Sequence, residues 1–599
     1  MSYAVPDIIT PQTAVTLAGL FRERVRRSPD ASAYRYFDET TMQWQTARWA
    51  DMARQVARWQ SALSQEGLQR GDRVAVMLQN GREWVCFEQA ALGLGLVVVP
   101  LYVNDRAENA AYILRDAGAK FLVIGGAEHW EGLCEVRSQL AELVRIVVEK
   151  SFDGMDSSLT LLSAWLPVDG GELRTVDGDA DDLATLVYTS GTTGHPKGVM
   201  LSHRNILSNA YSCSRTVPVD GDDVFLSFLP LSHALERSVG YYLPMMAGAT
   251  VAYARSIPDL PEDLLSVRPT ILISVPRIYE RIYAKLCAQL DEKPPMARRL
   301  FESAVEVGWQ CFEHRQGRAP WRVPQVWWPL LEKLVARKLI NKMGGRVRVA
   351  VCGGAPLSPA IAKVFVGLGL PLIQGYGLTE TSPVVCANKL EDNIPASVGL
   401  PLQDVAVSLG NNGELLVRGP NVCLGYWNKP EASAALIDSD GWLHTGDVAR
   451  IEGCHVFITG RLKEIIVLAN GEKLPPADME TAIGRDPVFE HVLVIGEGRP
   501  YLSALVVLTP ERWKTLARSL DINPDAAEAL HSKAVEKWAL GCIAAQVRGF
   551  PGYVQVRRVA VSLLPWTIEN GLLTPTLKVR RERILAQFRD EVDRLYQGH

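Results

Sequence analysis

YTSGTTGHPKG, from Tyr188 to Gly198, is the stretch of this 599-residue chain from which the fold can best be inferred. Apolar residues lead into it and follow it. Gly191 and Gly194 accept backbone conformations that other residues resist, so several N–H groups can face one point. Lys197 adds a positive charge, and three side chains add hydroxyl groups: Ser190, Thr192 and Thr193. This combination predicts a loop that binds a polyphosphate.

The loop differs from the phosphate-binding loop of P-loop nucleotide hydrolases. That motif places its lysine between a glycine and a Ser or Thr, whereas Lys197 follows Pro196 and precedes Gly198. A flexible polar loop without a ligand is the alternative interpretation of this segment.

Length and composition indicate a globular protein with more than one domain. A chain of 599 residues exceeds the size at which a single core keeps growing. The net charge of −4 gives no argument for nucleic-acid binding, and no nucleic-acid partner is expected. The ten cysteines include no CxxC pair, which favours small buried residues in a reduced compartment over a zinc site.

The sequence favours a cytoplasmic location. The first ten residues, MSYAVPDIIT, lack the basic start and apolar centre of a signal peptide. The longest uncharged apolar run, residues 90–103, has fourteen residues and is too short to span a bilayer. We therefore expect at most peripheral contact with the inner face of the membrane. The sequence does not indicate an oligomeric state.

Helical and strand patterns alternate along the first part of the chain. Residues 16–27 and 47–67 have the periodicity of amphipathic helices, whereas residues 74–78 and 96–102 are apolar strands separated by a helix from Glu83. The alternation predicts an α/β fold with layered, largely parallel sheets. Functional residues are then expected in loops at the carboxyl ends of strands.

The pattern changes twice farther along the chain. Long helical patterns with few strands cover residues 258–345, and a new α+β pattern begins near Glu464. We predict a large N-terminal domain with several subdomains, residues 1–462, and a small α+β domain, residues 463–599.

A second cluster is QGYGLTETS, from Gln374 to Ser382. Gly375 and Gly377 allow a ligand to approach the backbone closely, and the ring of Tyr376 can lie against a flat base. The carboxylate of Glu380 is a hard ligand suited to Mg²⁺ beside phosphates. A loop followed by a helix with a threonine cap is the alternative.

Two further clusters follow. In GWLHTGDVAR, residues 441–450, the carboxylate of Asp447 could accept both hydroxyls of a ribose. In TGRLKEIIVLANGEKLPPADME, residues 459–480, basic side chains including Arg461 surround an apolar strand. An ordinary turn aspartate and a solvated basic turn are the alternatives when each cluster is taken alone.

The last cluster is ENGLLTPTLKVRR, residues 569–581, where Lys578 follows a turn; taken alone, it is typical of a surface lysine. In their order along the chain, the five clusters resemble those of the adenylate-forming synthetase superfamily, which includes acyl-CoA synthetases, peptide-synthetase adenylation domains and beetle luciferases. Three more segments look like long-chain fatty acyl-CoA synthetases: FLPLSHALER (228–237), SVPRIYERIY (274–283) and VCGGAPL (351–357). The helical segment at about residues 291–345 is similar to the helical insert of these synthetases, and the resemblance implies that the small C-terminal domain is mobile.

The resemblance implies a ligase that works in two steps. A carboxylate attacks the α-phosphorus of ATP in the presence of Mg²⁺, giving acyl-adenylate and pyrophosphate, and the thiol of coenzyme A then displaces AMP. Positioning and charge neutralisation would supply most of the catalysis, because two anions must meet. Transfer to a carrier protein and a short-chain or aromatic acid substrate are alternatives within this class. A non-catalytic nucleotide-binding scaffold is an alternative outside it.

The resemblance also implies the site residues. Thr189 and Glu380 would hold Mg²⁺, and Lys578 would contact the carboxylate and the α-phosphate. His233 would lie between the acyl and thiol channels, with a packed core histidine as the alternative. The implied ATP-binding residues are Ser190, Gly191, Thr192, Thr193, Gly194, Lys197, Gly354, Ala355, Pro356, Gln374, Gly375, Tyr376, Gly377, Thr379, Asp447 and Arg461.

By the same resemblance, Lys463 occupies a hinge. The C-terminal domain would rotate between the two steps, withdrawing Lys578 and bringing the loop at 469–473 toward the thioester site. Some long-chain relatives have an aromatic gate four residues after the histidine that corresponds to His233. Arg237 stands at that offset, so the gate is not carried over to this chain.

A long-chain acid requires a deep apolar tunnel, since each buried CH₂ contributes roughly 0.8 kcal/mol. Residues 225–230, 241–249 and 274–283 are the candidate walls. Residues 314–348 hold nine Lys and Arg against one acid, with three tryptophans among them: Trp321, Trp327 and Trp328. This mixture favours an anionic bilayer surface, and a basic helix packed on the N-terminal domain is the alternative.

Overall fold

The computed structural model describes residues 7–140, 142–189, 195–469, 472–486, 488–526, 529–548, 550, 555–574 and 577–597. The predicted phosphate-loop residues Ser190, Gly191, Thr192, Thr193 and Gly194 lie outside this set, as does part of the loop at 469–473.

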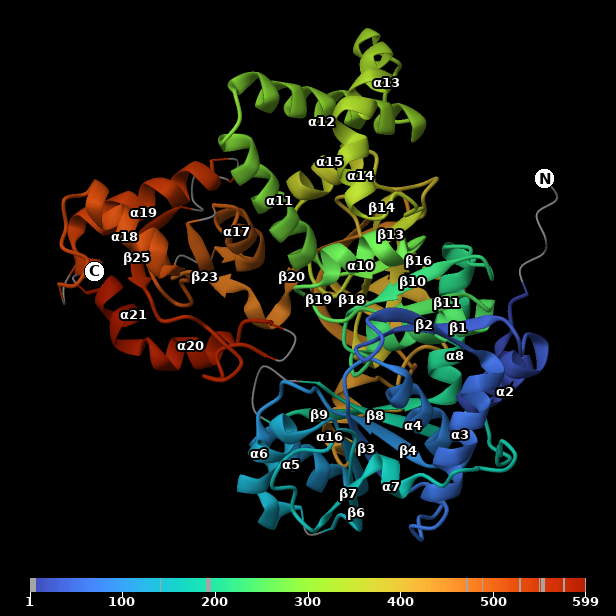
Figure 1. Ribbon diagram of the computed structural model, residues 1–599. Helices are drawn as coiled ribbons and strands as arrows, with labels where there is room; N and C mark the ends of the chain where they lie inside the picture. The colour runs from blue at the N-terminus through green and yellow to red at the C-terminus, as the bar shows by residue number, and fades with distance from the viewer. Residues whose placement is uncertain are drawn as a thin grey trace.

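Two large β-sheets, with helices between and around them, form the body of the molecule (Figure 1). The first has the strand order β7-β6-β5-β3-β4-β8-β9. Its neighbouring strands are parallel except β8 and β9, which pair antiparallel. The bounds are β3 Arg73–Met77, β4 Val97–Pro100, β5 Ala119–Ile124, β6 Arg145–Val148, β7 Leu159–Leu161, β8 Leu183–Thr189 and β9 Lys197–Ser202.

The second large sheet has the order β16-β15-β14-β13-β12-β10-β11-β1-β2. The strands from β14 to β1 in this order are parallel, and the outer pairs are antiparallel. The bounds are β1 Ser32–Asp38, β2 Gln43–Arg48, β10 Val224–Ser227, β11 Thr250–Tyr253, β12 Ile271–Ser274, β13 Val349–Cys352, β14 Leu372–Gly377, β15 Val384–Ala387 and β16 Leu400–Pro401.

The inner strands are apolar along their whole length, as parallel strands covered on both faces require. VVVP of β4 and ILIS of β12 are fully buried. The largest core joins both sheets through the helices between them. These helices are α4 (Arg82–Gly93), α8 (His203–Thr216) and α9 (Leu243–Ala247), with the π-helix η2 (Glu236–Tyr242) preceding α9. The predicted α/β fold with layered sheets is therefore confirmed.

A smaller antiparallel sheet completes the body, with the order β17-β18-β19-β20. Its bounds are β17 Ala406–Leu409, β18 Glu414–Arg418, β19 Leu443–Glu452 and β20 His455–Arg461. The short 3₁₀ helix η6, Leu462–Glu464, follows β20 directly. The chain leaves the body at this point.

A helical arm projects from the body, at the top of Figure 1. Its elements are α11 Pro276–Asp291, α12 Pro295–Arg315, η3 Val323–Trp327, α13 Trp328–Leu331, η4 Glu332–Ala336 and α14 Arg337–Lys342. Helix α12 packs against α15 (Pro359–Gly367) through two glycines. A Cβ on Gly308 would lie 1.8 Å from the Gly367 carbonyl oxygen, so only glycine permits this approach.

The residues after 464 have their own sheet and cores. The sheet order is β23-β24-β25, with β23 (Phe489–Ile495) antiparallel and β25 (Val556–Ser562) parallel to β24 (Leu502–Leu508). Two core clusters hold only residues from this part of the chain. The helices are α17 Pro476–Ile483, α18 Pro510–Ser519, α19 Lys533–Gln546, α20 Arg581–Gln587 and α21 Arg589–Leu595.

Candidate active site

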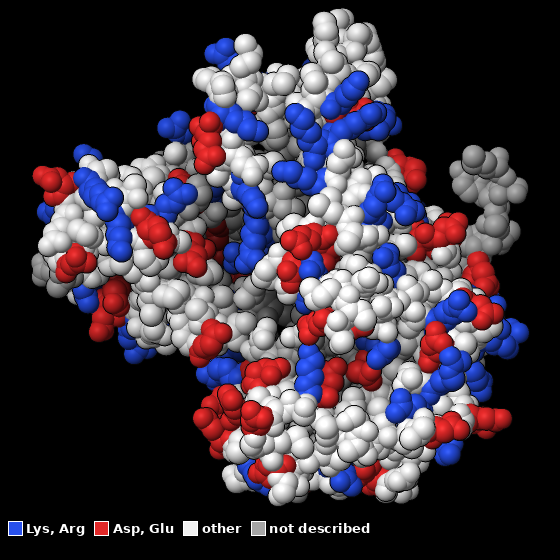
Figure 2. All heavy atoms as spheres, in the orientation of Figure 1, with Lys and Arg blue, Asp and Glu red and all other residues white. Residues whose placement is uncertain are grey.

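A cavity of about 600 Å³ lies where the two large sheets, the four-stranded sheet and the C-terminal part meet. The surface is hollowed between the C-terminal part and the body in Figure 2. The lining includes residues at or just after the carboxyl ends of parallel strands: Thr189, His233, Gly354 and Tyr376. Open α/β sheets bind ligands at this edge, because polar loops collect there.

At one end of the cavity, the side chain of Tyr426 contacts both Lys197 and Glu380. Lys197 pairs with Thr189 across β8 and β9, so both residues reach the same end of the hairpin. The Lys197 Nζ lies 4.8 Å from the ring centroid of Tyr426, whose hydroxyl donates to Glu380 Oε1 at 2.8 Å. Tyr426 was not predicted; the aromatic pair in GYWN, residues 425–428, is the signal that could have revealed it.

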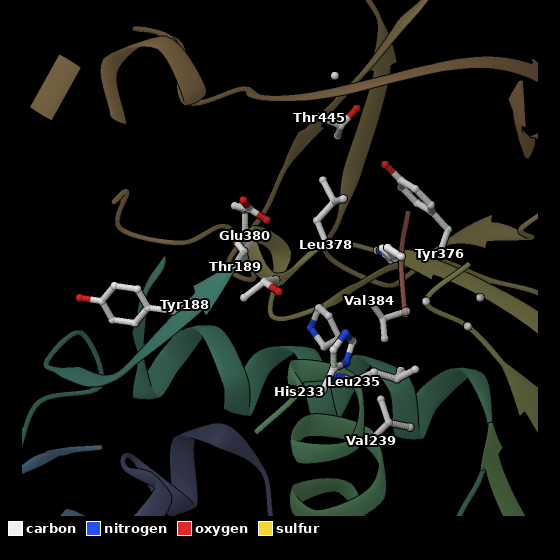
Figure 3. A pocket seen from close by; sticks show the side chains of 18 of the residues that line it. Tyr188, Thr189, His233, Leu235, Val239, Tyr376, Leu378, Glu380, Val384 and Thr445 are labelled. Carbon is white, nitrogen blue, oxygen red and sulfur yellow. Dashed lines mark hydrogen bonds between the residues drawn. The ribbon is translucent and has the colours of Figure 1, made fainter. Parts of the chain in front are cut away.

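Thr189 and Glu380 offer oxygen ligands of the type that Mg²⁺ prefers. Both line the cavity, and Figure 3 shows them on the same side of it. Within the described residues, no group of three or more His, Cys, Asp and Glu forms a metal cluster. Two protein oxygens fit Mg²⁺, which commonly takes one or two ligands from side chains and the others from phosphates and water.

Asp447 joins the four-stranded sheet to the loop after β14. Its buried carboxylate accepts from the Tyr376 hydroxyl at 2.5 Å and from Arg461 Nε at 2.9 Å. Burial and then Asp447 raise the pKa of the Tyr376 hydroxyl far above its ordinary value, so it stays a donor. The structure thus brings together three residues predicted to surround a nucleoside.

Three predicted adenine-site residues do not line the cavity: Ala355, Pro356 and Gln374. Gln374 is buried, and its amide accepts from the Leu357 N–H at 3.3 Å and donates to the Pro395 carbonyl. It therefore holds the loop after β13 in place. Gly354, Gly375, Gly377 and Thr379 do line the cavity.

One of these glycines is required by its surroundings. A Cβ on Gly377 would lie 1.8 Å from the Pro383 carbonyl oxygen, so any larger residue would push apart the turn that carries Glu380. That turn is the 3₁₀ helix η5, Thr379–Thr381, which packs against β9. The glycine thus holds the carboxylate beside the β8–β9 hairpin.

Lys578 enters the cavity from the C-terminal part. Its N–H donates to Thr574 Oγ1 at 3.0 Å, and its carbonyl accepts from the Thr574 N–H at 2.8 Å. The Lys578 side chain faces the open space of the cavity, and the other lining residues enclose that space. Burial and then Arg461 lower the pKa of the ammonium, while Asp447 and Glu380 act in the opposite direction.

His233 lies in the loop after β10 and points into the cavity (Figure 3). Its Nδ1 accepts from the Leu235 N–H at 3.2 Å. Burial and then Lys578 lower the pKa of the ring to about 4, so the imidazole is neutral near pH 7. Because Nδ1 is an acceptor, the proton of the neutral ring is on Nε2, which can donate into the cavity.

An apolar branch of the cavity runs along one face of the nine-stranded sheet. Ile271 and Ile273 alternate along β12 and therefore share a face, and Ile273 lies opposite Val351 of β13. Phe225 pairs with Ile271 near the amino-terminal edge of the sheet. The other apolar or small lining residues are Cys213, Thr216, Val217, Val219, Leu235, Val239, Leu243, Ile373, Val384, Ala387 and Leu402.

The predicted tunnel walls were only partly right. Residues 225–230 contribute Phe225 and residues 241–249 contribute Leu243, but residues 274–283 do not line the cavity. Helix α11 begins at Pro276 and carries Tyr279 into the core of the helical arm. Helix α8, which was not among the predicted walls, contributes Cys213 and Thr216 to the apolar branch.

Arg237, the residue at the gate offset, does not line the cavity either. It is buried in η2, where its Nε donates to Glu88 Oε1 at 2.6 Å and its Nη1 donates to Thr185 Oγ1 at 2.8 Å. The guanidinium also lies 5.5 Å from the ring centroid of Trp84. Arg237 therefore ties η2 to α4 and β8.

Comparisons with known proteins agree with this geometry. A family model described as AMP-binding enzyme matches residues 21–427, and one described as AMP-binding enzyme C-terminal domain matches residues 463–599. The chain belongs to the AMP-binding enzyme family. The predicted resemblance to the adenylate-forming superfamily is thereby confirmed.

This AMP-binding enzyme has relatives of similar length. One is the Mycobacterium bovis protein named long-chain-fatty-acid–CoA ligase FadD15, 31% identical over 99% of both chains. Another is the Arabidopsis thaliana protein named long-chain-fatty-acid–[acyl-carrier-protein] ligase AEE15, chloroplastic, 29% identical over 88% of this chain and 80% of the relative.

Solved structures agree on the fold of this AMP-binding enzyme. The adenylation domain of a carboxylate reductase from Mycobacterium chelonae matches with a TM-score of 0.77 at 23% identity, over 97% of this chain and 91% of that one. At this identity the likeness concerns the fold alone.

Several polar residues outside the predicted set also line the cavity of this AMP-binding enzyme, and two of them are charged residues from opposite parts of the chain. Arg580 from the C-terminal part and Asp105 from the body both line it. Their charges interact, because Arg580 counteracts the rise that burial causes in the pKa of Asp105. Lys463, predicted as the hinge, also lines the cavity. The residue at which the chain leaves the body is therefore part of the site wall.

Proposed function

We propose that the chain activates a long-chain fatty acid with ATP and transfers the acyl group to coenzyme A. A carboxylate oxygen bonds to the α-phosphorus of ATP as pyrophosphate leaves, giving the acyl-adenylate. The thiol sulfur then bonds to the acyl carbon as AMP leaves and the thiol proton passes to solvent. The observation that carries this proposal is one cavity holding Lys578, Glu380 and an apolar branch.

The polar end of the cavity supports the first step. Lys197 and the predicted loop from Ser190 to Gly194 would hold the β- and γ-phosphates, and Asp447 the ribose. Thr189 and Glu380 would hold Mg²⁺, which when bound neutralises phosphate charge. Lys578 would approach the α-phosphate and the incoming carboxylate, where negative charge collects in the transition state.

His233 is suited to hold the carboxyl group. Its neutral ring, with the proton on Nε2, would donate to an oxygen of the bound carboxylate and later to the acyl carbonyl. A protonated ring would instead add a second cation beside Lys578. We infer that the low pKa of His233 avoids a further positive charge next to Lys578.

We also propose the domain division 1–462 and 463–599, with Lys463 as the hinge. The separate sheet and cores after residue 464 support it. In the state seen here Lys578 faces the cavity, which suits the first step. The second step would require the C-terminal domain to rotate about η6 so that the thiol can enter.

Transfer to a carrier protein is the second candidate, because the AEE15 relative is named for that acceptor. A short-chain or aromatic acid is the other alternative for the substrate. The apolar branch that extends to Phe225 and Ile271 favours a long acyl chain over both small acids.

A substrate panel tests the proposal. Straight-chain acids from acetate to lignocerate, with benzoate as the aromatic member, are incubated with ATP, Mg²⁺ and coenzyme A while AMP and acyl-CoA are both measured. We expect both products from long-chain acids. Acyl-adenylate that accumulates beside unused coenzyme A would favour the carrier-protein alternative, and turnover restricted to acetate or benzoate would refute the substrate class.

Among the described residues, no helix combines the length and apolar character needed to cross a bilayer. The proposed substrate is a lipid, so we propose a cytoplasmic enzyme in peripheral contact with the inner face of the membrane.

A further inference from the structure

The helical arm ends in a tip with exposed apolar side chains. The side chains of Trp321, Val326 and Trp327 are 54%, 63% and 61% exposed. Three more apolar residues of the tip are also exposed: Val323, Leu330 and Leu334. Elsewhere in the described chain large exposed apolar residues are mostly scattered one by one, which is ordinary for a protein surface.

The tip residues from η3 to η4 form a stripe. Val326, Leu330 and Leu334 follow one another at intervals of four, so their side chains lie on one side of the helical segment. Trp327 stands three residues before Leu330 and flanks the same side. A continuous apolar face is thus presented to solvent.

Trp328 shows that the tip is held in shape by other contacts. Its indole packs against α12 and α15, where a Cβ on Gly308 would lie 2.5 Å from it. Gln325 is buried, and its amide donates to the Gln310 carbonyl at 2.8 Å. Neighbouring residues of the same segment therefore face inward and fix the exposed tryptophans outward.

Basic side chains border this apolar face. Within the described part of the chain, ion pairs involve Arg318, Arg337 and Arg348 of the nine basic residues. The other six form no ion pair with any described residue: Arg315, Arg322, Lys333, Lys338, Lys342 and Arg346. In Figure 2 the tip shows mainly uncharged atoms, and Lys and Arg side chains gather below it.

We propose that this tip docks on an anionic lipid bilayer, with the apolar stripe in the headgroup region and the basic residues on lipid phosphates. The inference deepens the proposed function, since it assigns the surface that would meet the lipid substrate. At a bilayer surface, burial of apolar side chains and electrostatic attraction to anionic lipids both add to the binding strength. A bilayer fits better than a second copy of this chain, because two tips with unpaired basic residues would repel each other.

Sedimentation with sucrose-loaded vesicles tests the proposal on the full chain without ATP or acid. Vesicles of phosphatidylcholine with phosphatidylglycerol are compared with vesicles of phosphatidylcholine alone, at low and high salt. We expect binding to the anionic vesicles that weakens at high salt. The Trp321→Ser/Trp327→Ser variant should bind roughly ten-fold more weakly, because it loses the largest apolar contacts.

Charge reversal provides the second arm. Lys333→Glu/Lys338→Glu should lower the affinity at least about ten-fold, because each basic residue near an anionic surface adds several-fold. The matched controls are Lys514→Glu/Lys537→Glu, on exposed lysines of the C-terminal part, and Val168→Ser, on a 97% exposed valine. Both controls should bind like the original chain.

Three results would overturn the proposal. They are binding that ignores vesicle charge, tip variants that bind like the original chain, and a dimer in light scattering that only the tip variants lose. Acyl-CoA formation from albumin-delivered acid is measured in parallel and should be the same in all variants. If no acid is activated, the proposed function fails while the vesicle result still stands on its own.

Discussion

Lys578 reaches the cavity across the junction between the two parts of the chain, and Lys463 at that junction lines the same cavity. Burial and the positive charge of Arg461 lower the pKa of the Lys578 ammonium, and the negative charges of Asp447 and Glu380 raise it. Its protonation is therefore sensitive to the surrounding charges. At this scale, the chemistry of the site depends on which side chains are charged at neutral pH.

Replacing Lys578 by Ala is expected to lower pyrophosphate–ATP exchange about 10²- to 10³-fold, because a preorganised charge at the transition state is lost. The dissociation constant of ATP should change little. Lys578→Arg is the matched control. Burial and Arg461 lower the lysine pKa, so the original rate should fall at high pH, and the arginine variant should move that fall upward. An exchange rate untouched in Lys578→Ala would contradict the assignment.

Glu236 predicts a pH dependence of stability. Burial raises its pKa to about 8, against 4.5 for the ordinary carboxyl group, while the Ser227 hydroxyl acts in the opposite direction. The folded state therefore binds more protons than the unfolded state between these values, and the free energy of unfolding falls as pH rises through this window. Glu236→Gln should raise Tm at pH 8 and leave it nearly unchanged at pH 4. An equal change in Tm at both pH values would show that ionisation is not the cause.

At the scale of elements, the short parallel strands set where each chemical function lies. Polar loops follow their carboxyl ends, and the apolar branch runs back toward their amino ends past Ile273 and Ile271. The phosphates would therefore lie beside the β8–β9 hairpin, near the carboxyl edge of the nine-stranded sheet, and the tail of a fatty acid would extend toward the amino edge of that sheet. Changes at the two edges should have separable effects.

Ile271→Trp should shorten the acyl chain that the enzyme accepts. The larger ring would fill the apolar branch near the edge of the sheet, and excluding three methylenes would lower kcat/KM for long acids by about fifty-fold. Activity with medium-chain acids should remain. Ile271→Val is the control and should keep the chain-length profile. A uniform loss at every chain length, with a lowered Tm, would indicate general damage to the core.

Variants of Arg237 test whether this residue anchors η2 to its neighbours or gates the acyl path. Arg237→Met leaves the Glu88 carboxylate buried without its partner and should lower the free energy of unfolding by about 3–5 kcal/mol. The Glu88→Met/Arg237→Met pair should recover much of this loss. The chain-length profile of the double variant should match that of the original chain. A profile shifted to longer acids would instead assign Arg237 to the acyl path.

The sequence was sufficient to predict several of the helices and strands and the loops that follow those strands. The segment from Tyr188 to Gly198 was expected to join two apolar runs, and the strands β8 and β9 flank it. The helix expected over residues 16–27 appears as α2, Leu17–Arg27, with the Thr16 hydroxyl accepting from the Gly19 N–H. Local patterns carry this information because periodicity and capping are local.

Long-range pairings could not be predicted in this way. Glu88 and Arg237 are 149 positions apart, and Tyr426 meets Glu380 across 46 positions. Such contacts follow from the order of strands in a sheet and not from spacing along the chain. The orientation of the arm's tryptophans could not be predicted either. Trp328 faces inward because it packs against Gly308, whereas its neighbour Trp327 is exposed.

At the scale of the whole molecule, the two parts of the chain share one cavity, and in the proposed reaction they would move relative to each other between the two steps. Arg461, at the end of β20, holds Asp447, and η6 begins with the next residue. A rotation at η6 would therefore move Lys578 while leaving the nucleoside contacts in the body. In the proposed reaction, the residues that hold the nucleoside would therefore stay in place while the cation that acts on the α-phosphate moves.

Lys463→Pro should damage the second step more than the first. Proline restricts the backbone of η6, so rotation should be hindered while the state seen here remains accessible. In single-turnover assays, thioester formation should slow at least about ten-fold while adenylation changes by less than about three-fold. Lys463→Ala is the control for loss of the side chain. Equal losses in both half-reactions would contradict a hinge at this residue.

The length of the four-residue strands sets how much of an acyl tail could lie along the sheet in the proposed complex. Strands β10, β12 and β13 each have four residues, so the sheet is roughly 13 Å deep along its strands at 3.3 Å per residue. A tail that outgrows this depth would emerge near Val219. The Pro218 carbonyl beside it accepts from Arg348 at 2.7 Å, and Arg348 is the last residue of the basic segment, residues 314–348. The end of a very long fatty acid would thus leave the protein beside the base of the arm that we propose to rest on lipid.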